Sequence, residues 1–190
     1  QHADQDGEQQ PDLFVDAARQ AGALIKANYG TDLGVNETLQ YDLKLELDVQ
    51  SQELITNILL AAFPDHAIYG EEHGHAGNAS SPWKWVIDPI DGTSNFVRGV
   101  PVWATLIALV HDIDGPVLGV VSAPALPRRW WGARGIGAFA NGRPMKVSEV
   151  STVAEAQISV TFNAGWGQVG GTQALVSLQQ RAYRARGYGD

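Results

Sequence analysis

The chain has 190 residues, of which 44% are hydrophobic, with a formal charge of −8 and no cysteine. The apolar fraction is that of a globular protein, and an acidic chain lacks the basic face that sequence-independent nucleic-acid binding requires. The absence of cysteine excludes disulfides, thiolate metal ligands and a cysteine nucleophile. No apolar run approaches the ~18 residues of a spanning helix, so we expect neither a nucleic acid nor a membrane as a partner.

The N-terminal segment predicts a tail followed by a helix. Residues 1–11 have no large apolar side chain and are expected to form a mobile tail. From Asp12 onward, apolar residues recur at the i, i+3, i+4 and i+7 spacing of one helix face, and Gly30 is a suitable end. The face expected to be buried consists of Phe14, Ala17, Ala18, Ala21, Leu24 and Ile25.

A loop and a second helix are expected next. Residues 31–43 have the composition of a loop, and the following apolar periodicity predicts a helix from about Val49 to Phe63. Asp48 stands directly before this helix, where it is as readily an N-cap as a functional residue. A short strand over 67–70 and a turn-rich loop over 73–82 follow.

Beyond residue 82 the pattern changes from helix to strand. Runs of β-branched and aromatic residues predict strands over 85–87, 102–110, 117–123 and 130–133. Asn141-Gly142 lies between two apolar segments and predicts a type I′ hairpin. This block is therefore expected to be mainly antiparallel sheet.

The pattern shifts once more after Ser148. A strand is expected over 157–162, and then a helix over 172–186 that buries Ala174, Leu175, Leu178 and Ala182. We therefore predict three parts: the tail over 1–11, an α+β subdomain over 12–148 that includes the functional site, and the start of an α/β subdomain over 149–190.

Four carboxylates are expected at the ends of two strands, namely those of Glu71, Glu72, Asp88 and Asp91. Asp91 is expected in a turn after Pro89. Two like charges ~4 Å apart repel by about 4 kcal/mol at an effective dielectric of 20, so a cluster of acids is stable only with protons or cations. Oxygen ligands without cysteine suit Mg²⁺ rather than Zn²⁺. The pattern therefore predicts a magnesium site formed by Glu71, Glu72, Asp88 and Asp91 with a backbone carbonyl.

The residues that follow Asp91 predict an anion-binding element. Asp91-Gly92-Thr93-Ser94 can begin a helix, whose free N–H groups bind phosphate, and Gly92 lets the backbone approach a ligand closely. The Thr93 hydroxyl lies at the same place. Acids that bind a metal beside such a helix start form a site for a phosphate ester, in which metal-activated water attacks in line.

Each of these features also has an ordinary structural interpretation. A lone Asp-Gly-Thr is common in plain turns, Asp88 can simply cap a strand end, and Glu71-Glu72 alone most often form a solvated turn. The combination in this order favours a functional site over those interpretations.

Other candidate motifs are expected to be structural. Arg128-Arg129-Trp130-Trp131 combines charge with aromatic rings, but in an acidic chain it is better explained as a strand that packs its tryptophans. His73 and His75 are expected in a solvated loop. His66 and His111 are expected at the surface or in loops, and Ser122 and Ser159 lack the context of a hydrolase nucleophile.

Gly70-Glu71-Glu72 followed by WVIDPIDGTSNF over 85–96 resembles the inositol monophosphatase family of Mg²⁺-dependent, lithium-sensitive phosphatases. The resemblance extends over most of the chain from about residue 12 and includes the hairpin segment 137–148. Segments 95–105, 120–131 and 180–190 most resemble the bacterial histidinol-phosphatase branch, which acts in histidine biosynthesis. This implies an α/β fold, an α+β layered sandwich of the sugar-phosphatase type, with its second half incomplete.

The resemblance also implies the metal ligands. Glu71 is expected to bind the activating metal and contact the attacking water, and Glu72 to be a more distant or third-metal acid. The remaining expected ligands are Asp88, which bridges two ions, Asp91 and the carbonyl of Ile90.

For the substrate, the resemblance implies binding by Asp91, Gly92, Thr93 and Ser94, with the N–H groups of Gly92 and Thr93 on the phosphate. The Thr93 hydroxyl is expected to pair with Asp48 and polarise the attacking water. Where the family has P-V-T-x-A-D, this chain has LKLELD over 43–48, without the Pro and the Thr. None of the six tryptophans precedes an Asp, so the family's later Trp-Asp pair is missing and the chain is expected to be C-terminally truncated.

The implied activity is Mg²⁺-dependent hydrolysis of a small phosphorylated substrate by metal-activated water, with histidinol phosphate first. The alternatives are an inositol phosphate or another sugar phosphate, or a metal- and anion-binding fragment without turnover. The family further implies a cytoplasmic enzyme that is a homodimer at full length.

Overall fold

The computed structural model describes residues 6–29, 35–38 and 43–187. The chain divides into two compact units, Gln1–Met145 and Lys146–Asp190. The division lies close to the boundary predicted at 148/149. Each unit is described by itself below.

The first unit is built on an eight-stranded sheet in the order β10-β9-β8-β7-β6-β5-β3-β4. Neighbouring strands are antiparallel except β3 and β5, which are parallel. The prediction of a mainly antiparallel block is therefore confirmed. The strands are β3 (Ala67–Gly70), β4 (Gly74–Gly77), β5 (Trp83–Asp91), β6 (Ala104–His111), β7 (Gly115–Ala123), β8 (Arg128–Ala133), β9 (Gly137–Ala140) and β10 (Arg143–Met145).

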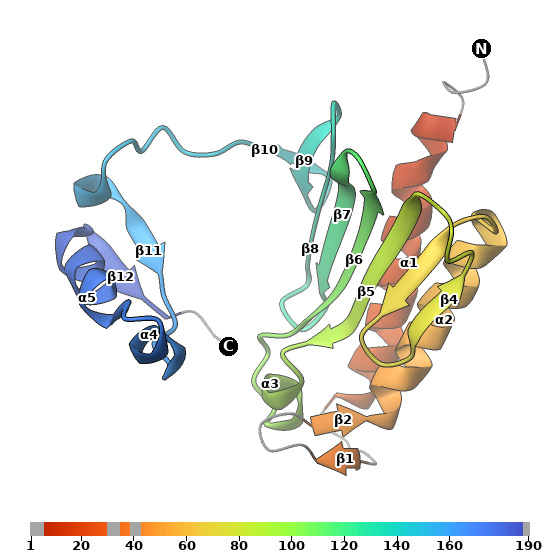
Figure 1. The fold of residues 1–190 in the computed structure, drawn as a ribbon, viewed down its shortest axis with the longest axis horizontal. Coiled ribbons are helices and arrows are strands. Elements are labelled where there is room, and N and C mark those ends of the chain that lie inside the picture. The colour runs from red at the N-terminus through yellow and green to blue at the C-terminus, as the bar shows by residue number, and fades with distance from the viewer. Residues whose placement is uncertain (1–5, 30–34, 39–42, 188–190) are drawn as a thin grey trace. The chain divides into compact units, whose positions relative to one another are not determined.

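Two long helices, α1 (Asp6–Asn28) and α2 (Glu46–Ala62), pack on the same face of this sheet (Figure 1). The apolar stripe predicted for α1 is confirmed, because Phe14, Ala17, Ala18 and Ala21 are at most 1% exposed. Small alanines let the helix lie close to the strands, and the removal of this stripe from water is the main term that stabilises the layer. The same core contains Ile55 and Leu59 of α2 and, from the sheet, Ile68, Trp85, Ile87, Ile107, Leu109, Leu118 and Val120.

Several predicted boundaries were wrong at the N-terminal end. α1 begins at Asp6, so residues 6–11 of the expected tail are helical, and residues 1–5 lie outside the described residues. Within the segment expected as a loop, β1 (Val35–Thr38) pairs antiparallel with β2 (Leu43–Leu45). β1 is mostly polar and β2 has only three residues, so neither shows the alternation over four or more residues that identifies a strand from sequence.

Two further elements differ from expectation. α2 begins at Glu46, so Asp48 lies inside the first turn rather than before it. The loop expected over 73–82 contains β4, whose glycine-rich sequence is held by backbone pairing to β3 while its side chains are exposed. By contrast, the type I′ hairpin is confirmed, since Asn141 and Gly142 both have positive φ, 47° and 77°.

The second unit contains two short parallel strands and three helical segments. Leu175 of α5 is buried as predicted, whereas Ala174 is exposed, Leu178 is 37% exposed and Ala182 is partly buried. Of the strand predicted over 157–162, only the first half forms, and the helix predicted over 172–186 ends at Arg181 because β12 follows. The elements are η1 (Val153–Glu155), β11 (Gln157–Ser159), α4 (Gly165–Gln168), α5 (Thr172–Arg181) and β12 (Arg184–Arg186). Among the helices of the described residues, none has the length and apolar character of a membrane span.

His66, in the turn between α2 and β3, is less exposed than the sequence suggested. Its ring stacks on Phe63 and Trp83 at centroid distances of 5.0 and 6.0 Å. The Nδ1 atom is buried and has no hydrogen-bond partner among the described residues. Burial lowers the pKa of His66 below its ordinary value of 6.5, although Asp65 opposes the shift.

We expect this lowered pKa to make the protein less stable in mild acid. A folded-state pKa below the unfolded value means that stability is fully present above pH 6.5 and is lost as pH falls. His66→Phe keeps a stacking ring and removes the titration. Thermal unfolding should therefore give similar midpoints for both proteins at pH 8 and a higher midpoint for the variant at pH 5.5. An equal loss in both proteins would contradict the expectation.

Candidate functional site

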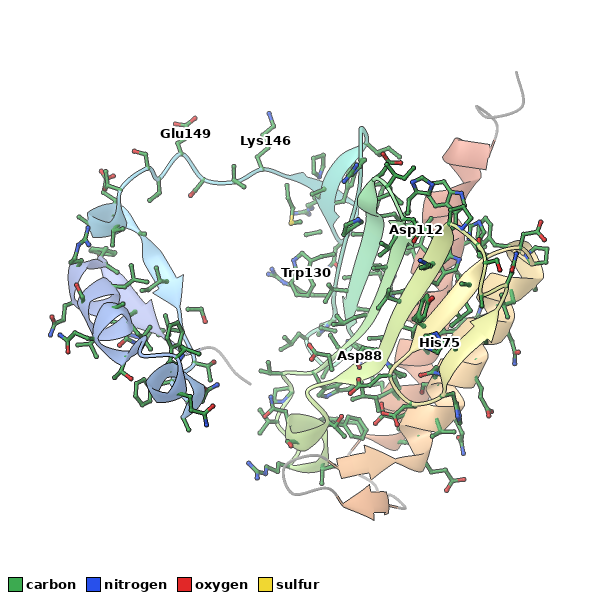
Figure 2. The ribbon with its side chains drawn as sticks, viewed as in Figure 1. His75, Asp88, Asp112, Trp130, Lys146 and Glu149 are labelled. Carbon is green, nitrogen blue, oxygen red and sulfur yellow. The ribbon has the colours of Figure 1, made fainter. Side chains whose placement is uncertain are left out.

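The parallel pairing of β3 and β5 brings two acidic segments to one edge of the sheet. Gly70 is in register with Ile87, and the N–H of Glu71 donates to the Ile87 carbonyl at 3.2 Å. Glu71 and Asp88 are the next residues of the two strands and therefore lie side by side. Figure 2 shows Asp88 at this end of β5, the end opposite to Asp112.

Asp91 reaches the same site because β5 contains a bulge. Asp88 pairs with Leu106 and Asp91 with Ala104, so β5 advances one more residue than β6 between these pairs. A bulge leaves a residue out of the ladder and accommodates a proline, which has no N–H to donate. The expectation that Pro89 ends the strand and leaves Asp91 in a turn was therefore wrong, since β5 continues to Asp91.

Asp88 is the electrostatic centre of the cluster. Burial, followed by the charges of Glu71 and Asp91, raises the pKa of Asp88 from an ordinary 3.8 to about 7, with a smaller contribution from Glu72. The buried Oδ1 of Asp88 has no hydrogen-bond partner within the part of the chain that is described. At neutral pH this group therefore holds a proton for part of the time unless a cation compensates the cluster.

The donor atoms at this edge fit a hard divalent cation. They are all oxygens, from carboxylates and from the carbonyl of Ile90, and the buried Oδ1 of Asp88 lacks a partner. Within the described ranges, no three His, Asp or Glu side chains are already gathered tightly enough to hold a metal ion. Because carboxylates repel one another without a cation, binding requires these side chains to rotate inward.

The turn after Asp91 has a backbone conformation that requires glycine. Gly92 is in the left-handed region, with φ 86° and ψ 39°, and precedes the short helix α3 (Thr93–Val97). A Cβ at Gly92 would lie 3.0 Å from the carbonyl oxygen of Val102. Below the turn, Phe96, Trp103 and Ile90 form a buried cluster with Ile25 and Leu47. The packing therefore fixes the direction in which α3 begins.

The hydroxyl of Thr93 donates to the carbonyl oxygen of Ile90 at 2.9 Å. It therefore closes the turn onto an expected metal ligand, and its pairing with Asp48 stays a prediction. Asp48 is 2% exposed in the first turn of α2, so it is held inside the protein rather than at a solvated cap. Ser94, the last expected substrate contact, is partly exposed, and its carbonyl accepts the N–H of Arg98 at 3.2 Å.

The sequence analysis missed one polar residue beside the acids. Gln52 is 3% exposed, and its Oε1 accepts the backbone N–H of Glu72 at 2.9 Å. A polar residue four positions after Asp48, on the same apolar helix face, was the available indication. A single polar residue in an apolar stripe has too many ordinary explanations to be singled out from sequence.

The motifs expected to be structural agree with their surroundings. In β8, Trp131 contacts Phe14 and Phe139 at centroid distances of 6.2 and 4.4 Å. Arg129 donates to Ser122 at 3.4 Å, and Ser122 is 1% exposed.

His73 and His75 are exposed, with His75 in β4 rather than in a loop. The Nε2 atom of His73 lies 3.7 Å from a carboxylate oxygen of Glu53. Across the described residues, no further ligand completes a metal group there. His111 ends β6 and packs its ring on Trp83 at 4.4 Å, so it too is less exposed than expected.

Comparison with known proteins gives a consistent result. The profile described as "Inositol monophosphatase family" matches residues 8–179. A histidinol-phosphatase of Mycobacterium tuberculosis is 50% identical over 185 residues, which cover 94% of this chain and 70% of that protein. A histidinol-phosphatase of Streptomyces coelicolor is 46% identical over 153 residues, which cover 76% of this chain. The matched region spans 57% of the length of the Streptomyces protein.

Among solved structures, the extragenic suppressor protein suhB of Bartonella henselae has the same fold. The TM-score is 0.83 at 28% sequence identity, and the match covers 94% of this chain and 69% of that chain. The expected fold class is therefore confirmed.

We predict that Asp88→Asn stabilises the protein when divalent cations are absent. The pKa of Asp88 is higher in the folded state than in the unfolded state, so ionisation costs stability as pH rises from about 4 to about 7. The side chain of the variant does not ionise, so the variant should be more stable at pH 8 by about 1 kcal/mol. This value is smaller than the full pKa shift would give, because solvent screens the charge of a partly exposed carboxyl group. Urea unfolding with EDTA should show this difference shrinking toward pH 4. A constant difference at every pH would contradict the role of ionisation.

We predict that Gly92→Ala destabilises the protein by more than Gly99→Ala does. Both glycines have positive φ, 86° and 72°, so both substitutions cost about 1–2 kcal/mol in backbone strain. At Gly92 the new Cβ would also lie 3.0 Å from the carbonyl oxygen of Val102, which is closer than normal contact. At Gly99 no described atom lies within 4 Å of the new Cβ. Urea unfolding of the two variants measures the difference, and equal losses would show that the close approach is relieved without cost.

Proposed function

The chain belongs to the inositol monophosphatase family, and from this premise we propose that it hydrolyses a small phosphate monoester in a reaction that depends on Mg²⁺. The observation that supports this most is the acid cluster around Asp88 directly beside the left-handed turn at Gly92. Clustered carboxylates attract a divalent cation, and N–H groups at a helix start favour an anion. A phosphate ester satisfies both requirements at once.

In this proposal the protein holds the cation with oxygen atoms. The proposed ligands are Glu71, Asp88, Asp91 and the Ile90 carbonyl, with Glu72 as a more distant acid. Members of this family are generally metal-dependent, and the hard donor set favours Mg²⁺. When bound, the ion would lower the pKa of an attacking water and would neutralise charge on the phosphoryl oxygens.

The remaining groups orient the reactants. The backbone N–H groups of Gly92 and Thr93, with Asp91 and Ser94, are proposed to hold the phosphate. The carboxylate of Glu71, an exposed residue, is proposed to accept a hydrogen bond from the attacking water. Asp48 and the Thr93 hydroxyl are proposed to polarise that water, which requires Thr93 to exchange its bond to Ile90 for one to Asp48.

We propose histidinol phosphate as the first substrate. Two relatives with the printed name histidinol-phosphatase are 46% and 50% identical to this chain, and the segments outside the core motif resemble that branch. The core motif contacts only the phosphate end of a substrate, so an inositol phosphate or another sugar phosphate is the second candidate. A cytoplasmic location and a homodimer at full length are part of the same proposal, as the family resemblance implies.

Turnover is tested by phosphate release from histidinol phosphate and from inositol 1-phosphate, each with MgCl₂ and with EDTA. We expect Mg²⁺-dependent release, faster with histidinol phosphate. A higher kcat/KM for inositol 1-phosphate would reverse the substrate assignment. A folded protein that binds Mg²⁺ without release from either ester would support the alternative, a metal- and anion-binding fragment without turnover.

The metal assignment is tested by Asp88→Asn. We expect loss of Mg²⁺-dependent turnover by at least about 100-fold, because the variant removes a charged ligand from the centre of the cluster. Asp112→Asn is the matched control, since Asp112 pairs with Lys84 at the opposite end of the sheet. Full activity in Asp88→Asn would show the metal assignment to be wrong.

A further inference from the structure

Gln52 connects helix α2 to the turn that contains Glu71 and Glu72. It is a buried polar side chain, 3% exposed, in a helix whose other buried residues include Ile55 and Leu59. Its Oε1 accepts the backbone N–H of Glu72 at 2.9 Å. Burying an amide among apolar residues costs free energy unless the amide is hydrogen-bonded, so this bond offsets part of the cost of removing the Gln52 amide from water.

Gly70 provides the space that Gln52 occupies. A Cβ built on Gly70 would lie 2.1 Å from Cδ and Nε2 of Gln52 and 2.3 Å from Oε1. The amide group of Gln52 therefore lies directly against the backbone of β3, at the last residue before Glu71. The Gln52 amide can occupy this position because Gly70 has no side chain.

The contact joins two groups of proposed catalytic residues. Asp48 and Gln52 are one helical turn apart on the buried face of α2, and both are at most 3% exposed. Through Gln52, the helix that contains Asp48 is bonded to the turn that contains Glu71. The N–H of Glu71 is in turn bonded to Ile87, the residue before Asp88.

We propose that Gln52 is a positioning residue, which fixes the Glu71–Glu72 turn relative to Asp48 and Asp88 and thereby raises the affinity of the acid cluster for Mg²⁺. The proposal deepens the function proposed above and rests on it. Glu71 is exposed, so its carboxylate is held mainly by its backbone. Loss of the acceptor would remove the bond between Gln52 and the Glu72 N–H and let the turn move away from Asp88.

The test uses the full chain and two readouts besides turnover. Hydrogen exchange reports protection of the Glu72 amide, and thermal unfolding with increasing MgCl₂ gives the half-saturating concentration. Gln52→Met removes the oxygen acceptor and keeps the bulk, whereas Gln52→Glu keeps an acceptor. Gln50→Met is the matched control, because Gln50 is exposed on the same helix and its amide bonds Glu46 at 3.2 Å.

We expect Gln52→Met to speed exchange at Glu72 and to raise the half-saturating Mg²⁺ concentration by about tenfold, the lower end of what loss of an orienting partner costs a metal site. Gln52→Glu should restore the protection, and Gln50→Met should match the wild type in both readouts. Unchanged exchange and unchanged Mg²⁺ response in Gln52→Met would overturn the inference. A wild-type protein that Mg²⁺ does not stabilise would instead overturn the proposed function.

Gly70→Ala gives a second test that does not alter Gln52. The three atoms nearest to the added Cβ all belong to the end of the flexible Gln52 side chain, so the substitution should displace the amide and weaken Mg²⁺ binding as Gln52→Met does. In a Gln52→Ala background these three contacts are removed, and Gly70→Ala should then have little further effect. Additive losses in the double variant would show that the two residues act independently and would contradict the proposal.

Discussion

The parallel pairing of β3 with β5 is the constraint on which the site depends. If β3 and β5 were antiparallel, like the other neighbouring strands of the sheet, their C-terminal ends would point in opposite directions. Because they are parallel, Glu71 lies beside Asp88. Burial of Asp88, and after it the like charges of Glu71 and Asp91, raises the pKa of this carboxyl to about 7. The fold therefore accepts an unfavourable electrostatic term at one edge, and the apolar core of α1, α2 and the sheet offsets it.

Two local irregularities shape this edge of the sheet. The bulge at Pro89 brings Asp91 to the edge, and the left-handed turn at Gly92 directs the chain into α3. Trp103 and Phe96 pack at 5.0 Å beneath that turn and fix its direction. Both irregularities lie beside the acid cluster, and departures from regular secondary structure of this kind are most often found next to ligand sites.

Regular elements with strong patterns were predictable from the sequence. The apolar stripe of α1 and the Asn141-Gly142 hairpin were identified because periodicity and turn chemistry act over a few residues. The short strands β1, β2 and β4 were missed because backbone pairing with a neighbour forms them, and three or four residues are too few for a strand pattern to be recognised. His66 was expected at the surface or in a loop, and its burial in the turn was missed because no local pattern indicates that Phe63 and Trp83 stack on its ring.

The sequence by itself determined the chemistry: which acids are present, that Glu71 and Glu72 follow the short strand predicted over 67–70, and that Gly92 and Thr93 come directly after Asp91. The order of residues contains this information because ligand type depends on side-chain chemistry alone. Only the tertiary structure decided which groups meet. The register of β3 on β5 and the Gln52–Glu72 contact bring together residues that are distant in the chain, and the raised pKa of Asp88 results from such neighbours. The energies of these interactions depend on burial and distance, which a linear sequence does not express.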